Sequence, residues 1–399
     1  MTARFIPLAI ALLVAGDATA ADLILPVPSA EAFAFHEDLF WLWLLEQTAM
    51  LVVPAWLLLS GRGALIARSS LSKAQGRVWF GTLLFAGFTG GLYTLAGLAA
   101  DGVRALQLTP YLARRPLDLP GWLAGQIVPT LGAVVALAVA GGLLNAIIRR
   151  SRRWWWAWVS GGVTILASIY LMVLPLMNET VRYPRIENTA YASWAPRLKT
   201  LAARASTQDV PVVVRKTVAG EFCPVQNSSV GLGPTRKIVL ADRTFTDWTP
   251  EMVEASFAHE LKHHLYDNTW FVVVLIAAMT GAGAFAIRVT GNAIVRRYPE
   301  SLGFSALAEP AALPLLALLL QGYLLVAMPA FHLTAQRREL DADRFALDLT
   351  QDKQARVAVS GRQCGGLWLT EDPLFDRLYL NTHPSVAKRL RLANDFVLR

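Results

Sequence analysis

The chain has 399 residues, of which 54% are hydrophobic and 17% charged, and its mean hydropathy is +0.41. A typical soluble domain is about 45–50% apolar, so this composition excludes that class and predicts an integral membrane protein. The net charge of +8 does not indicate nucleic-acid binding, because the basic residues fall in short clusters between apolar runs, as membrane topology places them.

The N-terminal stretch has the features of a secretory signal peptide. Arg4 precedes an apolar run of about a dozen residues, and the small residues Ala18 and Ala20 flank a candidate cleavage site. We therefore expect residues 1–20 to be a signal peptide. The alternative is an uncleaved first helix, although the run is shorter than the ~20 residues of a membrane span.

Six later stretches are long and apolar enough to span a membrane. They are residues 40–60, 79–100, 122–148, 155–177, 270–287 and 311–331. Basic residues cluster in alternate loops between them, namely Arg62, Arg68, Lys73 and Arg77, the run RRSRR at 149–153, and Arg288, Arg296 and Arg297. These loops are predicted to be cytoplasmic, which places both long polar stretches on the other side of the membrane.

The predicted spans divide the chain into a membrane region at 21–177 with four spans and a polar domain at 178–399, which a membrane hairpin at 270–331 interrupts. Glu46 is unusual inside the first span, because an intramembrane carboxylate normally faces protein or a water-filled cavity. It either lines a chamber or lies near the helix end. In the polar domain, VPVVVRKTV and RKIVLAD are β-branched runs typical of strands.

A helix with an unusual concentration of histidine follows these strands. Thr249 is suited to the N-cap and Pro250 to the first helical position. Four residues advance a helix by about 400°, so His259 and His263 project from one face, with Glu260 beside them. A His-Glu-x-x-His helix of this kind binds Zn²⁺ and supplies a carboxylate that can take a proton from water. A surface helix without a metal is the alternative.

A third ligand is expected from the segment AQRRELDADRFALD, which has helical character. Glu339 and Asp343 are four residues apart and so share one face. Catalytic zinc commonly binds two histidines and one carboxylate and keeps a position open for water. Glu339 is the predicted third ligand, and Asp343 would accept the distal N–H of a ligand histidine. Otherwise Asp343 is a solvated charge of the helix.

These residues resemble the membrane zinc endopeptidases that include HtpX and the type-I CAAX prenyl endopeptidase. The resemblance covers roughly residues 190–395. It rests on NSSVGLGPTRKIVLADRTF, HELKH, the membrane hairpin, RELDAD and THPSVAKRL at 382–390. It implies a mainly α, polytopic membrane protein with a small α+β zincin-like metalloprotease domain.

The resemblance also implies roles for individual residues. One zinc per chain would be bound by His259, His263 and Glu339, with Glu260 as general base. His383 and Arg389 match an element that steadies the oxyanion, although Pro384 in the same stretch also fits the first position of a helix. Asn227, or its neighbour Gln226, matches a substrate-contacting asparagine. Lys262 departs from the family, which usually has glycine there.

Cys223 and Cys364 are the only cysteines, one in each polar stretch. If both face an oxidising periplasm they can form a disulfide, and otherwise they are buried thiols. The predicted location is the bacterial inner membrane, with the catalytic domain on the periplasmic side.

The predicted function is hydrolysis of peptide bonds in membrane-associated or misfolded proteins. The expected partners are a protein or peptide substrate and the lipid bilayer, with no nucleic acid. One alternative is a sensor protease of the BlaR type, although only about 70 residues follow the last span and these carry the predicted site. The other alternative is a catalytically silent scaffold or chaperone.

Overall fold

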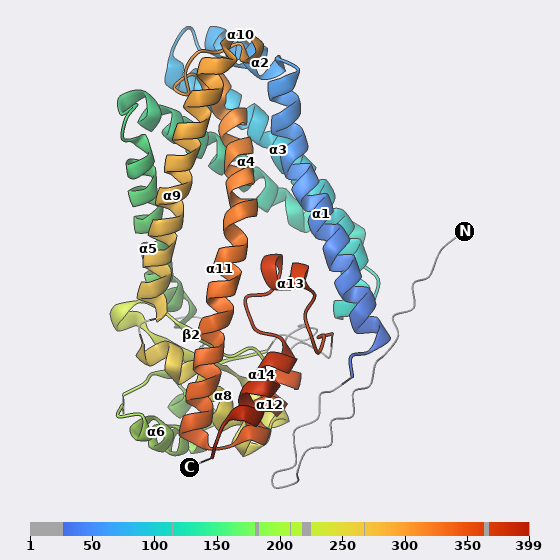
Figure 1. Cartoon of the computed structure of the whole chain (residues 1–399), viewed down its shortest axis with the longest axis vertical. Helices are drawn as coiled ribbons and strands as arrows, with labels where there is room; N and C mark the ends of the chain where they lie inside the picture. The colour runs from blue at the N-terminus through green and yellow to red at the C-terminus, as the bar shows by residue number, and fades with distance from the viewer. Residues whose placement is uncertain are drawn as a thin grey trace, which may run out of the picture.

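The computed structural model describes residues 27–113, 115–179, 183–207, 209–217, 225–266, 268–362 and 367–398. The predicted signal peptide and the two cysteines lie outside these ranges. The described chain is mainly helical, with long helices at one end and a small three-stranded sheet among shorter helices at the other (Figure 1). The predicted fold class, a polytopic membrane protein with a small α+β domain, is confirmed.

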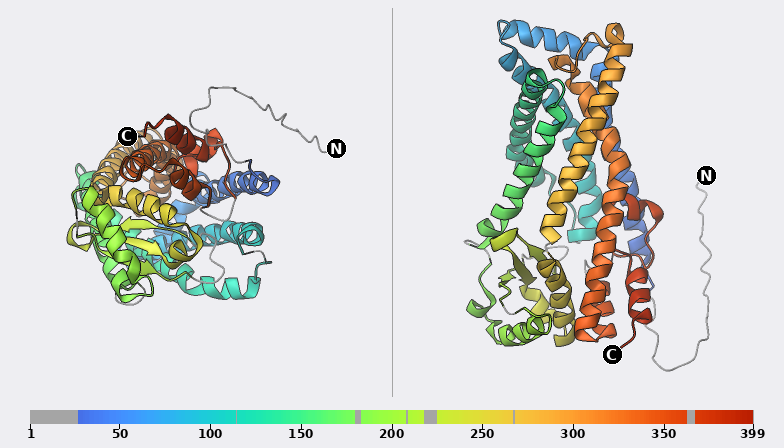
Figure 2. Two further views of the ribbon diagram at one scale, coloured as in Figure 1. Left: turned by 90° about the horizontal axis from the view of Figure 1, so that it is seen from below. Right: turned by 60° about the vertical axis from the view of Figure 1, so that its left-hand side comes forward.

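Among the described residues, 6 helices are long and apolar enough to cross a membrane. They run side by side for most of their length (Figure 2). These helices are α1 (Ala30–Leu59), α3 (Val78–Ala113), α4 (Leu119–Arg150), α5 (Trp155–Glu179), α9 (Asn268–Arg297) and α11 (Leu313–Thr350). Each covers all or nearly all of one predicted span, and α1, α3, α9 and α11 extend well beyond theirs.

Local sequence accounts for how these helices begin and how closely they pack. Helix α1 begins after Ser29, whose hydroxyl accepts a hydrogen bond from the Ala32 amide. Helix α4 begins after Asp118, whose carboxylate caps it in the same way. A Cβ atom at Gly90 would lie 3.0 Å from the Cβ of Leu137, so glycine lets α3 and α4 approach closely, as small residues do in membranes.

Glu46 in α1 forms an ion pair with Arg104 in α3. The distance from Arg104 Nη1 to Glu46 Oε1 is 2.7 Å. Both residues lie inside helices long enough to cross a membrane, where a charged side chain needs a partner. Glu46 therefore faces protein, and Arg104 belongs to the helix rather than to a loop after residue 100.

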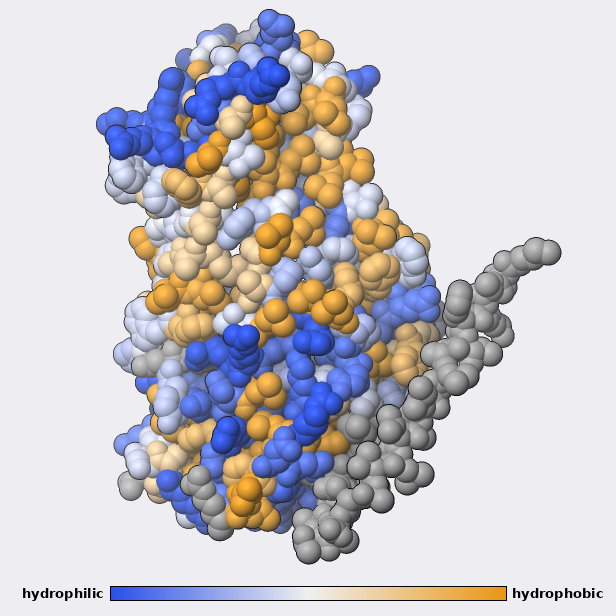
Figure 3. All heavy atoms as spheres, in the orientation of Figure 1, coloured by the Kyte–Doolittle hydropathy of each residue, from blue (hydrophilic) through white to orange (hydrophobic). Residues whose placement is uncertain are grey.

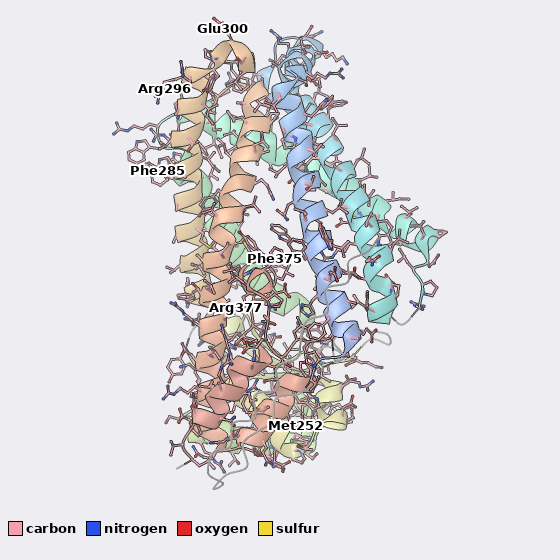
Figure 4. All side chains as sticks on the ribbon, turned by 45° about the vertical axis from the view of Figure 1, so that its right-hand side comes forward. Met252, Phe285, Arg296, Glu300, Phe375 and Arg377 are labelled. Atoms are coloured by element: carbon pink, nitrogen blue, oxygen red, sulfur yellow. The ribbon has the colours of Figure 1, made fainter. Side chains whose placement is uncertain are left out.

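The end of the molecule farthest from the sheet carries basic segments. Helix α2 (Arg62–Lys73) and helix α10 (Pro299–Leu302) meet there (Figure 1), since a Cβ at Gly303 would lie 3.0 Å from the Cβ of Ala64. Figure 4 places Arg296 and Glu300 at this same end. Figure 3 shows hydrophilic residues at this end and over the opposite domain, with more hydrophobic surface between them. This is the distribution of a chain whose middle contacts lipid.

The sheet has the strand order β1-β3-β2. Strand β1 (Val212–Arg215) pairs in parallel with β3 (Lys237–Ala241), in the register Val213 with Val239. Strand β2 (Ser228–Val230) pairs antiparallel with the other edge of β3. The two predicted strands are confirmed as β1 and β3, whereas β2 was not predicted, because three residues with two serines carry little strand signal.

Shorter helices complete the domain around this sheet. They are α6 (Ala195–Arg204), α7 (Asp242–Asp247), α8 (Pro250–Leu265), α12 (Lys353–Arg362), α13 (Leu374–Tyr379) and α14 (Val386–Asp395), with short 3₁₀ turns at Ile186–Asn188, Ala192–Trp194 and Gly233–Thr235. Another 3₁₀ turn, Pro310–Ala312, lies beside α2 at the opposite end of the molecule. Leu198 from α6, Ile238 from β3 and Phe257 from α8 are fully buried in the shared core. This core fixes the rotation of α8.

Helix α13 is held between α1 and α11 (Figure 1). The ring of Phe375, labelled in Figure 4, lies 4.8 Å from that of Phe40, and the Tyr379 ring lies 5.0 Å from that of Trp43. The Tyr379 hydroxyl donates to the Leu325 carbonyl in α11. The C-terminal segment of the polar domain is thereby fastened to the first membrane helix.

Candidate metal centre

Helix α8 carries the two histidines as predicted. Thr249 is its N-cap, and the hydroxyl accepts a hydrogen bond from the Met252 amide. Phe257 and Leu261 are fully buried against the sheet. His259 and His263 therefore project from the opposite side of the helix, because the apolar face is committed to the core.

Helix α11 brings Glu339 to these histidines. This helix continues past Pro329 without interruption, so the last membrane span and the polar segment RELDAD form one helix of 38 residues. Sequence reasoning treated them as two elements. The continuous helix holds Glu339 about two helical turns beyond the apolar stretch. Glu339 lies opposite α8.

Three side chains converge on one point. His259 Nε2 lies 3.3 Å from His263 Nε2 and 3.2 Å from Glu339 Oε2, and His263 Nε2 lies 3.3 Å from Glu339 Oε1. A tetrahedral site with metal–ligand distances of about 2.0 Å has ligand atoms about 3.3 Å apart. The three donors thus already have the mutual spacing that a zinc ion requires.

The unsatisfied polarity of the cluster also fits a cation. Glu339 Oε2 is buried and has no hydrogen-bond partner among the described residues. Two imidazole Nε2 atoms that face each other can be satisfied by a proton between them or by a shared metal ion. Two histidines and one carboxylate are a common ligand set for catalytic zinc. The residues present therefore fit this metal.

Asp343 orients one of the histidines. Its Oδ1 lies 2.8 Å from His259 Nδ1, which directs the other ring nitrogen toward Glu339. Asp343 is 1% exposed, so it is not a solvated charge of the helix. The same Oδ1 contacts Arg389 Nη1 at 3.3 Å and Arg356 Nη2 at 3.1 Å.

Arg356 was not predicted from the sequence. It lies on α12 and is 3% exposed. The stretch KQARVAVS has no recognisable motif, and one arginine in a short helix is more often a surface residue. Its small apolar neighbours were the only signal that this face of the helix is buried.

Burial and neighbouring charges set the protonation of the cluster. Burial disfavours the charged form of His259, but the hydrogen bond to Asp343 and the neighbouring Glu339 carboxylate outweigh this effect and raise the pKa of His259 to about 9 without a metal. Burial raises the pKa of Glu260, against the opposing effect of the two histidines. A carboxylate with a raised pKa is a better proton acceptor than an ordinary surface glutamate.

His383 and Arg389 lie at the rim of this cluster. His383 Nε2 lies 3.4 Å and Arg389 Nη2 3.6 Å from Glu339 Oε2. The His383 side chain is 62% exposed, whereas Arg389 is buried. Ser385 caps α14 and Pro384 precedes the cap, so the expectation that Pro384 occupies the first helical position is wrong.

Asn227 lies close to α8 and is engaged in hydrogen bonds within the protein. Its amide donates to Ser256 Oγ at 2.8 Å, and its carbonyl accepts from the Ala241 amide and the Thr244 hydroxyl. These bonds join α8 to the end of β3. Contact with substrate stays a prediction for this residue. Lys262 places its ammonium 3.4 Å from the centre of the Tyr266 ring and takes no part in the donor set.

Comparison with known proteins shows the family of this chain. The family model described as peptidase family M48 matches residues 197–396. The chain is 24% identical over 257 residues to the "Uncharacterized metalloprotease YhfN" of Bacillus subtilis (strain 168), an alignment that covers 62% of this chain and 58% of that protein. The chain thus spans less than two thirds of the length of this relative.

Among solved structures, the fold is similar to that of Ste24p from S. mikatae. The TM-score is 0.60 at 17% sequence identity, and the superposition covers 79% of this chain and 76% of the other. The likeness extends beyond the segment matched by the family model and shows that the arrangement of membrane helices around the small domain is shared.

Proposed function

This chain belongs to peptidase family M48, and we propose that it is a membrane metalloendopeptidase that uses one zinc ion held by His259, His263 and Glu339. The observation that carries the proposal is the spacing of 3.2–3.3 Å among the three donors. A zinc ion held by these residues would supply a Lewis acid that polarises the scissile carbonyl and lowers the pKa of a water molecule toward neutral pH.

Glu260 is the general base of the proposed mechanism. It follows His259 directly and is 8% exposed, so its carboxylate lies in a site that excludes most water. Its raised pKa lets it accept a proton from the attacking water and later deliver it to the leaving amine. Asp343 keeps the ring of His259 in one orientation during this exchange.

His383 and Arg389 are proposed to stabilise the negative charge on the substrate oxygen. Both approach Glu339 Oε2, and the exposed ring of His383 can reach a bound peptide. A positioned donor of this kind contributes about 10²- to 10³-fold to turnover. Strand β2, which was not predicted from the sequence, lies at an edge of the sheet and contacts α8. It offers a backbone for an extended substrate.

The proposed orientation places the catalytic domain on the periplasmic side of a bacterial inner membrane. The domain lies at the end opposite α2 and α10, and the loops rich in arginine belong to that opposite end (Figure 1). Positive loops stay in the cytoplasm. The substrates proposed are membrane-associated or misfolded proteins, and the proposed catalytic unit is residues 178–399.

Casein cleavage by the detergent-purified full chain tests the proposal. Cleavage should stop when phenanthroline removes the metal and return when zinc is added back. Glu260→Gln should lower turnover by about 10²- to 10⁴-fold without loss of zinc. Glu251→Gln is the matched control, because Glu251 lies exposed in the first turn of the same helix. Equal turnover by the wild type and Glu260→Gln would refute the assignment of the base.

A further inference from the structure

Asp343 is the meeting point of four helices. Its Oδ1 contacts His259 on α8, Arg389 on α14 and Arg356 on α12, while Asp343 itself lies on α11. The four side chains are between 1% and 7% exposed. Two guanidinium groups and one imidazole therefore share a single carboxylate oxygen in a dry environment.

We propose that Arg356 is a positioning residue for the metal centre, which acts through Asp343 on the ring of His259. The inference rests on the proposed function, since it concerns how tightly zinc is held. Arg356 Nη2 lies 3.1 Å from Asp343 Oδ1 and 3.3 Å from Ser360 Oγ. The serine is on the same helix as Arg356, so the nitrogen that contacts Asp343 is also held by a residue of its own helix.

The carboxylate of Asp343 has no alternative anchor among the described residues. Its Oδ2 is buried without a hydrogen-bond partner, as is Arg356 Nε. The orientation of the carboxylate therefore depends on the contacts made by Oδ1. Loss of Arg356 would leave Arg389 and His259 to hold it, and Arg389 is also drawn toward Glu339. The ring of His259 would then be held less firmly in the orientation that points Nε2 toward the metal.

The charges around Arg356 argue against the view that it serves only to fasten α12 to α11. A buried guanidinium is costly unless a carboxylate compensates it. The charged groups that face Arg356 are Asp343, Glu339, Glu260 and Arg389. All four were assigned to the proposed catalytic centre on other grounds. A residue needed only to fasten α12 to α11 could be apolar at lower cost.

A double-mutant cycle on zinc affinity tests the inference without relying on turnover. The full chain is purified as wild type, Arg356→Met, Asp343→Asn and the double variant, and the Kd for zinc is measured by competition with a chelating dye. Arg356→Met should weaken zinc binding by about 10-fold or more, as loss of partners behind metal ligands does. In the Asp343→Asn background the same substitution should change the Kd by about 2-fold at most, because the carboxylate through which it acts is gone.

Two further variants separate positioning from general damage. Arg356→Lys keeps a positive charge and should recover zinc affinity to within about 3-fold of wild type. Arg344→Met removes an exposed arginine next to Asp343 in the sequence and should leave the Kd unchanged. The melting temperature of each variant shows whether it is folded.

An unchanged zinc Kd in folded Arg356→Met would overturn the inference. So would an equal loss of affinity with and without the Asp343 carboxylate, because a merely structural role is additive. If the wild type binds zinc but cleaves nothing, the proposed peptidase activity fails, while the cycle on zinc affinity still decides the role of Arg356.

Discussion

His259 Nε2 lies 3.3 Å from His263 Nε2, and the carboxylate of Glu339 lies 3.2 Å from the first and 3.3 Å from the second. The first two residues are brought together by one helical turn, but Glu339 arrives from a helix that begins at the other side of the predicted membrane. The metal centre therefore depends on the packing of α8 against α11 and, through α11, on the membrane hairpin.

Zinc binding should release a proton and weaken as the pH falls. The pKa of His259 is raised to about 9 in the metal-free chain, so below that pH its ring is protonated, whereas a zinc ligand must be neutral. The Kd should therefore rise by about 10-fold for each pH unit below 9. Calorimetry at pH 7 in buffers of different ionisation enthalpy should find about one proton released per zinc. Release of none would contradict the protonation assigned to His259.

His36→Ala should reduce turnover but spare zinc binding. His36 on α1 pairs with Asp376 on α13, and its other ring nitrogen contacts the Leu367 carbonyl. Its loss leaves a carboxylate that is 2% exposed without this partner, at a cost of about 1–3 kcal/mol. The segment that leads to His383 should loosen, while the zinc ligands on α8 and α11 stay in place. The readouts are kcat, zinc content and thermal unfolding.

Glu37→Gln, an exposed neighbour on the same helix, is the control for His36. Normal turnover in folded His36→Ala would show that α1 serves only as an anchor and does not position the segment before His383.

The ion pair in the membrane region should contribute to stability as a unit. Glu46→Gln should lower the free energy of unfolding by about 1 kcal/mol, because Arg104 then lacks its charged partner. The double variant, Glu46→Gln with Arg104→Gln, should lose less free energy of unfolding than the sum of the losses in the two single variants. The stability of the three variants is measured by thermal unfolding in detergent. Strictly additive losses of stability would show that the ion pair makes no net contribution.

Lys262→Gly should leave the metal centre intact and weaken the helix. The resemblance implies glycine at this position, but inside a helix glycine costs about 1 kcal/mol. The substitution also removes the contact of the Lys262 ammonium with the Tyr266 ring. We expect a lower melting temperature with unchanged zinc content. Loss of zinc would show that Lys262 supports the ligand geometry.

Features that depend on local periodicity could be predicted from the sequence. These are the apolar spans, strands β1 and β3, and the cap of α8 by Thr249. The proposed zinc ligands were predicted from a spacing of four residues on a helix, together with a resemblance to known proteases. Strand β2 was missed because it is short and polar, and its pairing with β3 is a long-range property.

Tertiary packing accounts for the remaining differences. The continuation of α11 beyond residue 331 was not predicted, because the apolar pattern ends there. Pro329 lies inside this helix. Membrane helices tolerate it, since neighbouring groups compensate the lost hydrogen bond. Arg356 and the docking of α13 on α1 were also missed. Each depends on contacts between segments that no local pattern connects.

Metal analysis of three purified proteins tests the central claim most directly. Wild type and Glu260→Gln should each contain one zinc per chain, since Glu260 is a base and not a ligand. His263→Ala should lose most of its zinc while remaining folded, because one of the three converging donors is gone. Absence of zinc from wild type, or full zinc occupancy in His263→Ala, would contradict a catalytic zinc site at His259, His263 and Glu339.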